Sequence, residues 1–302
     1  ASDCTSCHED FSLVEGACVV GDGVWCATLE SMGLGGPTRG SNPDMMTVVN
    51  ATLYFVADDG IHGRELWRSD GTSDGTSLVA DVNPGAGDGA VGPPISVGET
   101  LVFVADNGQL GPELWSTDGT PEGTQLLKSF VFGPAGGAPR DFFRLGEEVY
   151  FVAYDQEHGE ELWRTDGTTA GTTLVRDIWQ GAKSSAIGPP IVVGSVAYFS
   201  ADEGKLGAEL WRTDGTFAGT FRVADIKAGQ YGSAPHDFVE LDGGILFVAD
   251  GWTGNELWRS DGTEAGTVIV TDLTPGTQSS GILHLTAFGD AAFFSTGYGS
   301  AA

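Results

Sequence analysis

Three aspartates recur in this sequence where their carboxylates could gather around one cation. Asp44, Asp141 and Asp237 are 97 and 96 residues apart, and an aromatic or methionine residue follows each of them. A ring of carboxylate oxygens suits calcium or another hard cation. The adjacent Arg140 and His236 would alternatively neutralise two of them. Each aspartate could also cap its own turn by accepting backbone N–H groups. All three interpretations stay open at this point.

A second set of residues could contact a ligand from polar, glycine-rich segments that differ between repeats. Imidazoles at His62 and His158 invite a metal or acid–base interpretation. The aromatic side chains of Trp179, Tyr231 and Trp252 would suit stacking against a sugar. Conserved scaffold strands beneath one diversified face are typical of a binding surface, although drift in unselected loops gives the same pattern.

Recognised catalytic motifs are absent from the sequence. It contains no GxSxG elbow, HExxH helix, phosphate-binding loop or dinucleotide fingerprint. Paired carboxylates carry little weight for glycoside chemistry in a chain with 42 acidic residues. We therefore favour a protein without enzymatic activity. The contrasting hypothesis is a metal-dependent hydrolase or lyase with its site at the mouth of a channel.

The elements that position these residues are set by a repeat. The segment Glu-Leu-Trp-Arg-Ser-Asp-Gly-Thr begins at Glu65, and related copies follow at steps of 48, 48, 48 and 47 residues; the later copies begin at Glu113, Glu161, Glu209 and Glu256. A fixed period of this length indicates stacked supersecondary units. The Asp of each DGT segment is expected to hold a turn.

One repeat is predicted to contain four strands. In the third unit we expect strands at 141–145, 149–153, 161–164 and 172–178, with turns at 146–147 and 166–171. β-Branched and aromatic residues favour strand in these segments, and frequent glycine disfavours helix. Four antiparallel strands per 47–48 residues match a propeller blade. The repeated tryptophan is then best explained as a wedge between neighbouring blades.

The predicted fold is all-β: a six-bladed β-propeller of four-stranded antiparallel blades. Residues 17–31 would pair with residues 282–297 to complete the last blade and remove free sheet edges. The domains would be a cysteine-rich segment, residues 1–16, and the propeller, residues 17–302. Innermost strands alternate between an Asp type and a Pro-Ile type, which suggests three double blades. Five blades with an unpaired N-terminal segment is the alternative.

The four cysteines all lie within the first 26 residues, as Cys4, Cys7, Cys18 and Cys26. Two disulfides suit an exported chain, and three pairings are possible; a zinc site with His8 is a further option. A three-residue turn at 21–23 would place Cys18 across from Cys26 in a hairpin. A two-residue turn would spoil this register.

The formal net charge of −28 narrows the class of partner. A surface this acidic repels nucleic acid and anionic lipid, so neither nucleic-acid binding nor membrane insertion is expected. There is no apolar run long enough to span a bilayer. The chain start fits a mature N-terminus from which an export signal has been removed.

The repeated Glu-Leu-Trp-x-x-Asp-Gly-Thr unit resembles the ELWxxDGT repeat of exported proteins from environmental bacteria such as myxobacteria. The match covers residues 41 to about 298, and it departs where Ser129-Phe130 replaces Asp-Ile and where a sixth Glu-Leu-Trp is missing. The resemblance implies secretion or surface display and carries no catalytic residues. The segment from Cys4 to Cys18 is weakly similar to small cysteine-rich extracellular modules.

These observations predict an extracellular or cell-surface module for binding or adhesion. Its ligand would be a glycan or a surface protein, contacted through the loops that carry His62, His158, Trp179, Tyr231 and Trp252. Calcium at Asp44, Asp141 and Asp237 is the one cofactor considered. A structural protein that self-associates into a surface layer is the third hypothesis.

Overall fold

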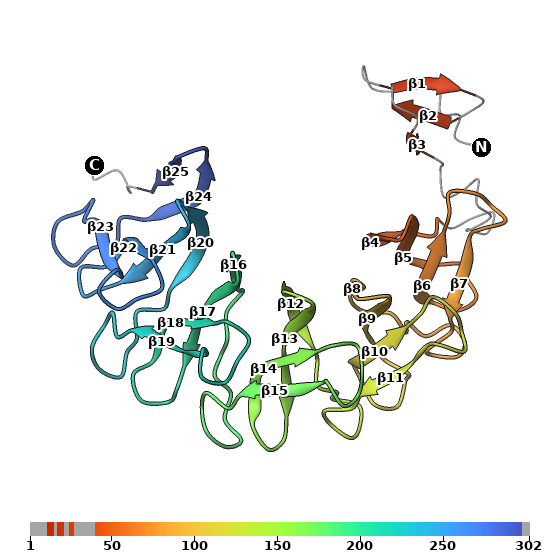
Figure 1. The fold of residues 1–302 in the computed structure, drawn as a ribbon, viewed down its shortest axis with the longest axis horizontal. Coiled ribbons are helices and arrows are strands. Elements are labelled where there is room, and N and C mark those ends of the chain that lie inside the picture. Colours follow the sequence, from red (N-terminus) through yellow and green to blue (C-terminus); the bar gives the residue numbers. More distant parts are fainter. Residues whose placement is uncertain (1–10, 15–16, 21–23, 27–39, 298–302) are drawn as a thin grey trace. The chain divides into compact units, whose positions relative to one another are not determined.

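The computed structural model describes residues 11–14, 17–20, 24–26 and 40–297, and its side chains from residue 40 onward (Figure 1). The chain divides into two compact units, residues 1–138 and 139–302. Every regular element in the described part is a β-strand. None of the described residues forms a helix with the length and apolarity needed to cross a bilayer.

Five antiparallel sheets of four strands follow one another along the chain. In the first unit, sheet 1 contains β4 (Asp44–Val49), β5 (Thr52–Asp58), β6 (Arg64–Ser69) and β7 (Ser77–Ala80), and sheet 2 contains β8 (Ile95–Val97), β9 (Thr100–Ala105), β10 (Glu113–Thr117) and β11 (Gln125–Lys128). In the second unit, sheet 3 contains β12 (Arg140–Leu145), β13 (Glu148–Asp155), β14 (Gly159–Thr165) and β15 (Thr173–Arg176). Sheet 4 contains β16 (Ile191–Val193), β17 (Val196–Asp202), β18 (Ala208–Thr213) and β19 (Phe221–Ala224), and sheet 5 contains β20 (His236–Leu241), β21 (Gly244–Asp250), β22 (Asn255–Ser260) and β23 (Val268–Thr271).

Each four-stranded sheet corresponds to one sequence repeat, so the prediction of four strands per repeat is confirmed. Consecutive strands are hydrogen-bonded neighbours in all five sheets. A two-stranded sheet of β24 (Ile282–Phe288) and β25 (Ala291–Thr296) follows sheet 5. Five four-stranded antiparallel sheets and a pair are consistent with a β-propeller.

Apolar side chains on facing sheets form the core. The second strand of every sheet contributes a phenylalanine that is fully buried; these are Phe55, Phe103, Phe151, Phe199 and Phe247. Between sheets 3 and 4, Val152 and Leu162 pack with Phe199 and Trp211. The same arrangement joins sheets 1 and 2 through Trp115 and sheets 4 and 5 through Trp258. The predicted role of this tryptophan between sheets is confirmed at these three positions.

The innermost strands alternate in length. In sheets 1, 3 and 5 they have six residues and a register shift, whereas β8 and β16 have three residues and a regular ladder. This confirms the predicted alternation over five repeats. β24 would be of the short type in a three-fold arrangement of double blades, but its pairing with β25 contains a shift between Leu283 and Thr286. The alternation therefore ends at sheet 5.

The DGT turns lie at the opposite end of each sheet from the loop between its second and third strands. In sheet 3, Asp166 Oδ1 accepts hydrogen bonds from Thr168 N at 2.8 Å and Thr168 Oγ1 at 2.7 Å. These bonds lower the pKa of Asp166. A Cβ at Gly171 would lie 2.0 Å from Asp166 Oδ1, so the turn requires glycine there. The expected structural role of this aspartate is confirmed.

The N-terminal strands β1 (Phe11–Val14), β2 (Ala17–Val20) and β3 (Val24–Cys26) form a sheet of their own. Cys18 and Cys26 are direct partners in its ladder, as the hairpin model predicted. Cys4, Cys7, the turn at 21–23 and residues 27–31 lie outside the described residues. The disulfides, the domain division after residue 16, the number of blades and the pairing of 17–31 with 282–297 stay predictions.

Candidate functional site

A buried glutamate at the start of each third strand holds the connection to the next sheet. The side chain of Glu161 is fully buried. It accepts hydrogen bonds from Ile178 N at 3.1 Å, from Trp179 N at 3.2 Å and from the Ser185 hydroxyl. Its equivalents are also fully buried and bind the corresponding connections; we call all five the clamp glutamates: Glu65, Glu113, Glu161, Glu209 and Glu256.

Burial raises the pKa of Glu161 to about 7, although bonds from Ser185 and two backbone N–H groups oppose the shift. The nearby charge of Asp177 acts in the same direction as burial. A carboxyl group with a pKa near 7 is suited to proton transfer. Because the connection covers this carboxyl group completely, its role is to fix the connection. Sequence reasoning identified the glutamate as a repeat marker and missed this role.

A hydroxyl group completes the shell of most clamp glutamates. Ser185, Ser233 and Ser280 each donate to the clamp glutamate 24 residues before them. In sheet 2 the equivalent position is Gly137, and Ser129 Oγ donates to Glu113 instead, at 3.1 Å. The Ser129 departure from the repeat therefore has a structural reason.

Sheet 1 has neither hydroxyl. Gly89 stands where Ser185 stands in sheet 3, and Asp81 stands where Ser129 stands in sheet 2. Asn83 N donates to Glu65 Oε1 at 3.1 Å. Glu65 Oε2 and Asp81 Oδ1 are buried without a hydrogen-bond partner. Burial raises the pKa of Glu65 to about 7, and the charges of Asp81 and Asp88 add to this effect.

The connection between sheets 3 and 4 meets the loop between β17 and β18 in a polar cleft. Residues 176–180 and 203–205, together with Trp211, line this cleft of about 320 Å³, which we call the Trp179 cleft. The two predicted loop families thus lie on the same face here. The Trp179 ring packs on Gly204, where φ is +84° and a Cβ would lie 2.3 Å from Trp179 Cε2.

The Trp179 cleft is locally balanced in charge. Arg176 and Lys205 on its walls face Asp177 and Glu203. Glu203 also accepts from Arg222 at 3.3 Å. Over the whole chain, by contrast, acidic residues outnumber basic ones by 42 to 14. The cleft therefore offers both donors and acceptors beside an indole ring.

The next connection repeats this geometry with different side chains. Lys227 forms an ion pair with Asp250, and its Nζ lies 5.2 Å from the centre of the Trp252 ring. Trp252 is 55% exposed, and Tyr231 of the same connection is 72% exposed. Both predicted aromatic residues are therefore available to a ligand, and both belong to the connection and loop between sheets 4 and 5.

The two predicted histidines are held within their own loops. His62 Nδ1 lies 2.7 Å from Asp59 Oδ2, and His158 Nδ1 lies 2.9 Å from Asp155 Oδ2. The Asp155 carboxylate that hydrogen-bonds the ring raises the pKa of His158, and Asp59 does the same for His62. Each aspartate also accepts the backbone N–H of its histidine. These contacts close the loops, and ligand binding by either histidine stays a prediction.

The three aspartates of the metal prediction do not occupy equivalent positions. Asp44 pairs with Val56 across the first hairpin of sheet 1, and Arg140 and His236 hold that ladder position in sheets 3 and 5. Asp141 and Asp237 lie one residue later, in a bulge, with φ of 53° each. The predicted equivalence is wrong, because matching by residue type shifted the alignment of sheet 1 by one residue.

Basic side chains accompany two of these aspartates. Arg64 forms an ion pair with Asp44, and Arg140 forms one with Asp141. Asp237 Oδ2 lies 3.9 Å from His236 Nε2. Among residues 40–297, no group of three or more His, Cys, Asp or Glu side chains is arranged to hold a metal ion. Calcium binding at these aspartates stays a prediction.

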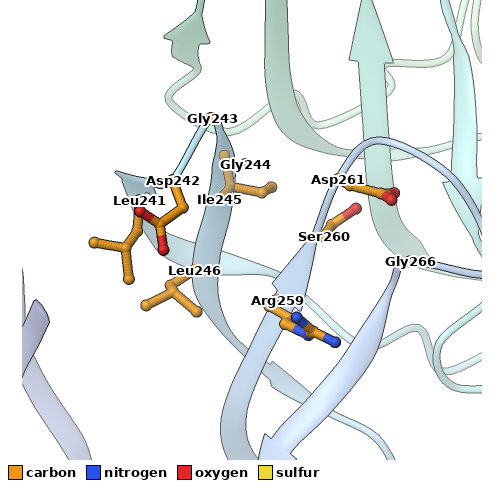
Figure 2. Close-up of a pocket in the computed structure, with 10 residues that line it drawn as sticks. All are labelled: Leu241, Asp242, Gly243, Gly244, Ile245, Leu246, Arg259, Ser260, Asp261 and Gly266. Carbon is orange, nitrogen blue, oxygen red and sulfur yellow. The ribbon is translucent and has the colours of Figure 1, made fainter. Parts of the chain in front are cut away.

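A second hollow, of about 310 Å³, lies in sheet 5 at the end that carries the DGT turn (Figure 2). Gly244 and Leu246 line it beside Arg259. In sheet 3 the residues at the positions of Gly244 and Leu246 are Glu148 and Tyr150, whose hydroxyl donates to the Glu148 carboxylate at 2.8 Å. The hollow is therefore the space left where side chains are smaller, and it is remote from the loop face.

No protein-family model matches this chain. No curated protein matches it either. A crystal structure of puromycin hydrolase is similar, with 18% identity and a TM-score of 0.45 over 77% of this chain and 39% of the other. Oligopeptidase B from Leishmania major has 10% identity and a TM-score of 0.47 over 76% and 32%, and TolB from Acinetobacter baumannii has 12% and 0.38 over 70% and 50%.

The chain spans about a third to a half of the length of these three structures. The similarity concerns the arrangement of β-sheet alone. The function has to be inferred from the loop face itself.

Proposed function

We propose that the protein is a non-catalytic binding or adhesion module that recognises carbohydrate or a surface protein through its loop face. The observation that supports this most directly is the Trp179 cleft, because loops from two consecutive sheets form it together. Its walls carry two basic and two acidic side chains beside an indole ring. Such mixed polar and aromatic surfaces are typical of recognition sites.

The clamp glutamates explain how the face can vary without loss of the fold. Most of the donors that reach them are backbone N–H groups of the connections, such as Ile226 N and Lys227 N on Glu209. Backbone donors are present whatever side chains the connection displays. The clamp therefore fixes the path of each connection and leaves its outward side chains free for recognition.

Export to the cell surface or outside the cell is part of the proposal. It is supported by the resemblance to ELWxxDGT-repeat proteins, by four cysteines within 26 residues and by a net charge of −28. A disulfide between Cys18 and Cys26 agrees with their direct pairing between β2 and β3.

A glycan array and a surface-protein capture assay on the full chain, each with and without a chelator, test the proposal. Lys205→Glu in the Trp179 cleft and Trp252→Ala at the next connection should each reduce binding at least fivefold. Glu264→Ala, at an exposed position in a DGT turn, is the matched control and should bind like the parent. Full binding by both loop variants would refute the loop face. Loss on chelation, restored by calcium, would support the metal prediction.

The finer fold belongs to the same proposal: six blades, the last completed by residues 17–31 beside residues 282–297. Its support is that β24 and β25 form a two-stranded sheet, whereas sheets 1 to 5 each have four strands. Hydrogen exchange of the backbone amides of β25 tests it in the full chain. Protection comparable to that of β22 supports completion, and rapid exchange along all of β25 contradicts it.

A further inference from the structure

Two buried polar atoms at the wall of the Trp179 cleft have no hydrogen-bond partner. They are Trp211 Nε1, on a side chain that is 2% exposed, and Asp177 Oδ1. Both residues line the cleft. The other carboxylate oxygen of Asp177 accepts from Gly181 N at 3.1 Å, so only one oxygen is left without a donor. An unpaired buried donor and an unpaired buried acceptor each destabilise the empty cleft.

The equivalent tryptophans of sheets 1 and 5 do not share this feature. Trp67 Nε1 donates to the Ala57 carbonyl at 3.1 Å, and Trp258 Nε1 donates to the Ala249 carbonyl at 3.1 Å. In sheet 4 the Arg176 guanidinium lies 5.8 Å from the centre of the Trp211 ring. The repeat can therefore satisfy this indole internally, and sheet 4 leaves its N–H directed to another partner.

Bulk solvent does not reach these two atoms, so their partners must come from a group enclosed in the cleft. That group must accept a hydrogen bond from the indole and donate one to the carboxylate. Hydroxyl groups do both. We propose that the Trp179 cleft binds a neutral saccharide whose hydroxyl groups pair with Trp211 Nε1 and Asp177 Oδ1. This inference rests on the proposed function and names the ligand class for that site.

The charges of the cleft favour a neutral ligand over an ion. Arg176 and Lys205 balance Asp177 and Glu203, and Glu203 is already paired with Arg222. No excess charge of either sign is left to attract a metal ion or a phosphate. The Trp179 ring at the rim supplies an apolar surface for the C–H faces of a sugar.

Titration calorimetry of the full chain with a panel of neutral mono- and oligosaccharides tests this inference. Trp211→Phe keeps the ring and removes only the indole N–H, and Asp177→Asn replaces one carboxylate oxygen with a donor. Each should weaken saccharide binding at least fivefold. Trp258→Phe makes the same change in sheet 5, where the N–H bonds a carbonyl, and should bind within twofold of the parent. Melting temperatures within a few degrees confirm that the variants are folded.

Three results would overturn the inference. One is saccharide affinity that falls equally in Trp211→Phe and Trp258→Phe, which indicates general destabilisation. A second is saccharide binding that depends on Trp252 and is unchanged in Trp211→Phe; the proposed function would then survive and this site would not. The third is no binding of any saccharide in the panel while a surface protein is captured through Lys205, which likewise leaves the proposed function standing.

Discussion

Replacing Asp81 with serine should stabilise the protein at neutral pH and leave it nearly unchanged in mild acid. The variant gives sheet 1 the arrangement of sheet 2, where Ser129 donates to Glu113 and the later position is glycine. In the parent, Glu65 Oε2 and Asp81 Oδ1 are both buried without partners. A serine hydroxyl would donate to Glu65, and a neighbouring negative charge would be removed.

The size of the effect follows from the pKa of Glu65. Burial raises it from 4.5 to about 7. A folded-state pKa above the unfolded one means that the folded protein binds more protons between these values. The free energy of unfolding therefore falls as the pH rises from 4.5 to 7, by about 3 kcal/mol at most for this group. A hydrogen bond to the charged carboxylate recovers about 1–2 kcal/mol of this.

Urea unfolding of the parent and Asp81→Ser at pH 4.5 and pH 7.5 measures the difference. We expect a gain of about 1–2 kcal/mol at pH 7.5 and a change below about 0.5 kcal/mol at pH 4.5. Ser129→Asp is the reciprocal control, and it should lose stability mainly at pH 7.5. An equal change at both pH values, or a loss for Asp81→Ser at pH 7.5, would refute the reasoning.

Three further predictions follow from the packing and the loops. Phe151→Ala should lower the free energy of unfolding by about 3–5 kcal/mol in chemical denaturation, because the ring is fully buried. Gly204→Ala should lower the melting temperature and change Trp179 fluorescence, because its Cβ would lie 2.3 Å from that ring at a φ of +84°; unchanged fluorescence contradicts the contact. NMR titration should place the pKa of His158 above 6.5, and Asp155→Asn should lower it.

The strands and DGT turns could be predicted from the sequence because their determinants are local. The β13 segment carries β-branched and aromatic residues, and the Asp166 turn is closed within six residues. The role of the clamp glutamates could not be found in the same way, because Glu161 meets donors 17 to 24 residues later. A serine that recurs 24 residues after three of these glutamates was the signal available.

The alignment of Asp44 with Asp141 failed for a related reason. A bulge inserts a residue into the innermost strands of sheets 1, 3 and 5, so residue type no longer marks the ladder position. The unpaired indole of Trp211 was also beyond prediction, because every copy of the repeat contains the same tryptophan. Only the hydrogen bonds of Trp67 and Trp258 show that sheet 4 differs.

Main-chain anchoring of the connections has a consequence for how such a protein can diversify. A connection moved from one repeat into another would still find its carboxylate, provided that the residue 24 positions after the glutamate remains glycine or serine, as it is in all five copies. Recombination between repeats would then exchange contact residues without disturbing the sheets beneath. Chimaeras that swap residues 178–184 with residues 226–232 should accordingly fold like the parent and trade their ligand preferences.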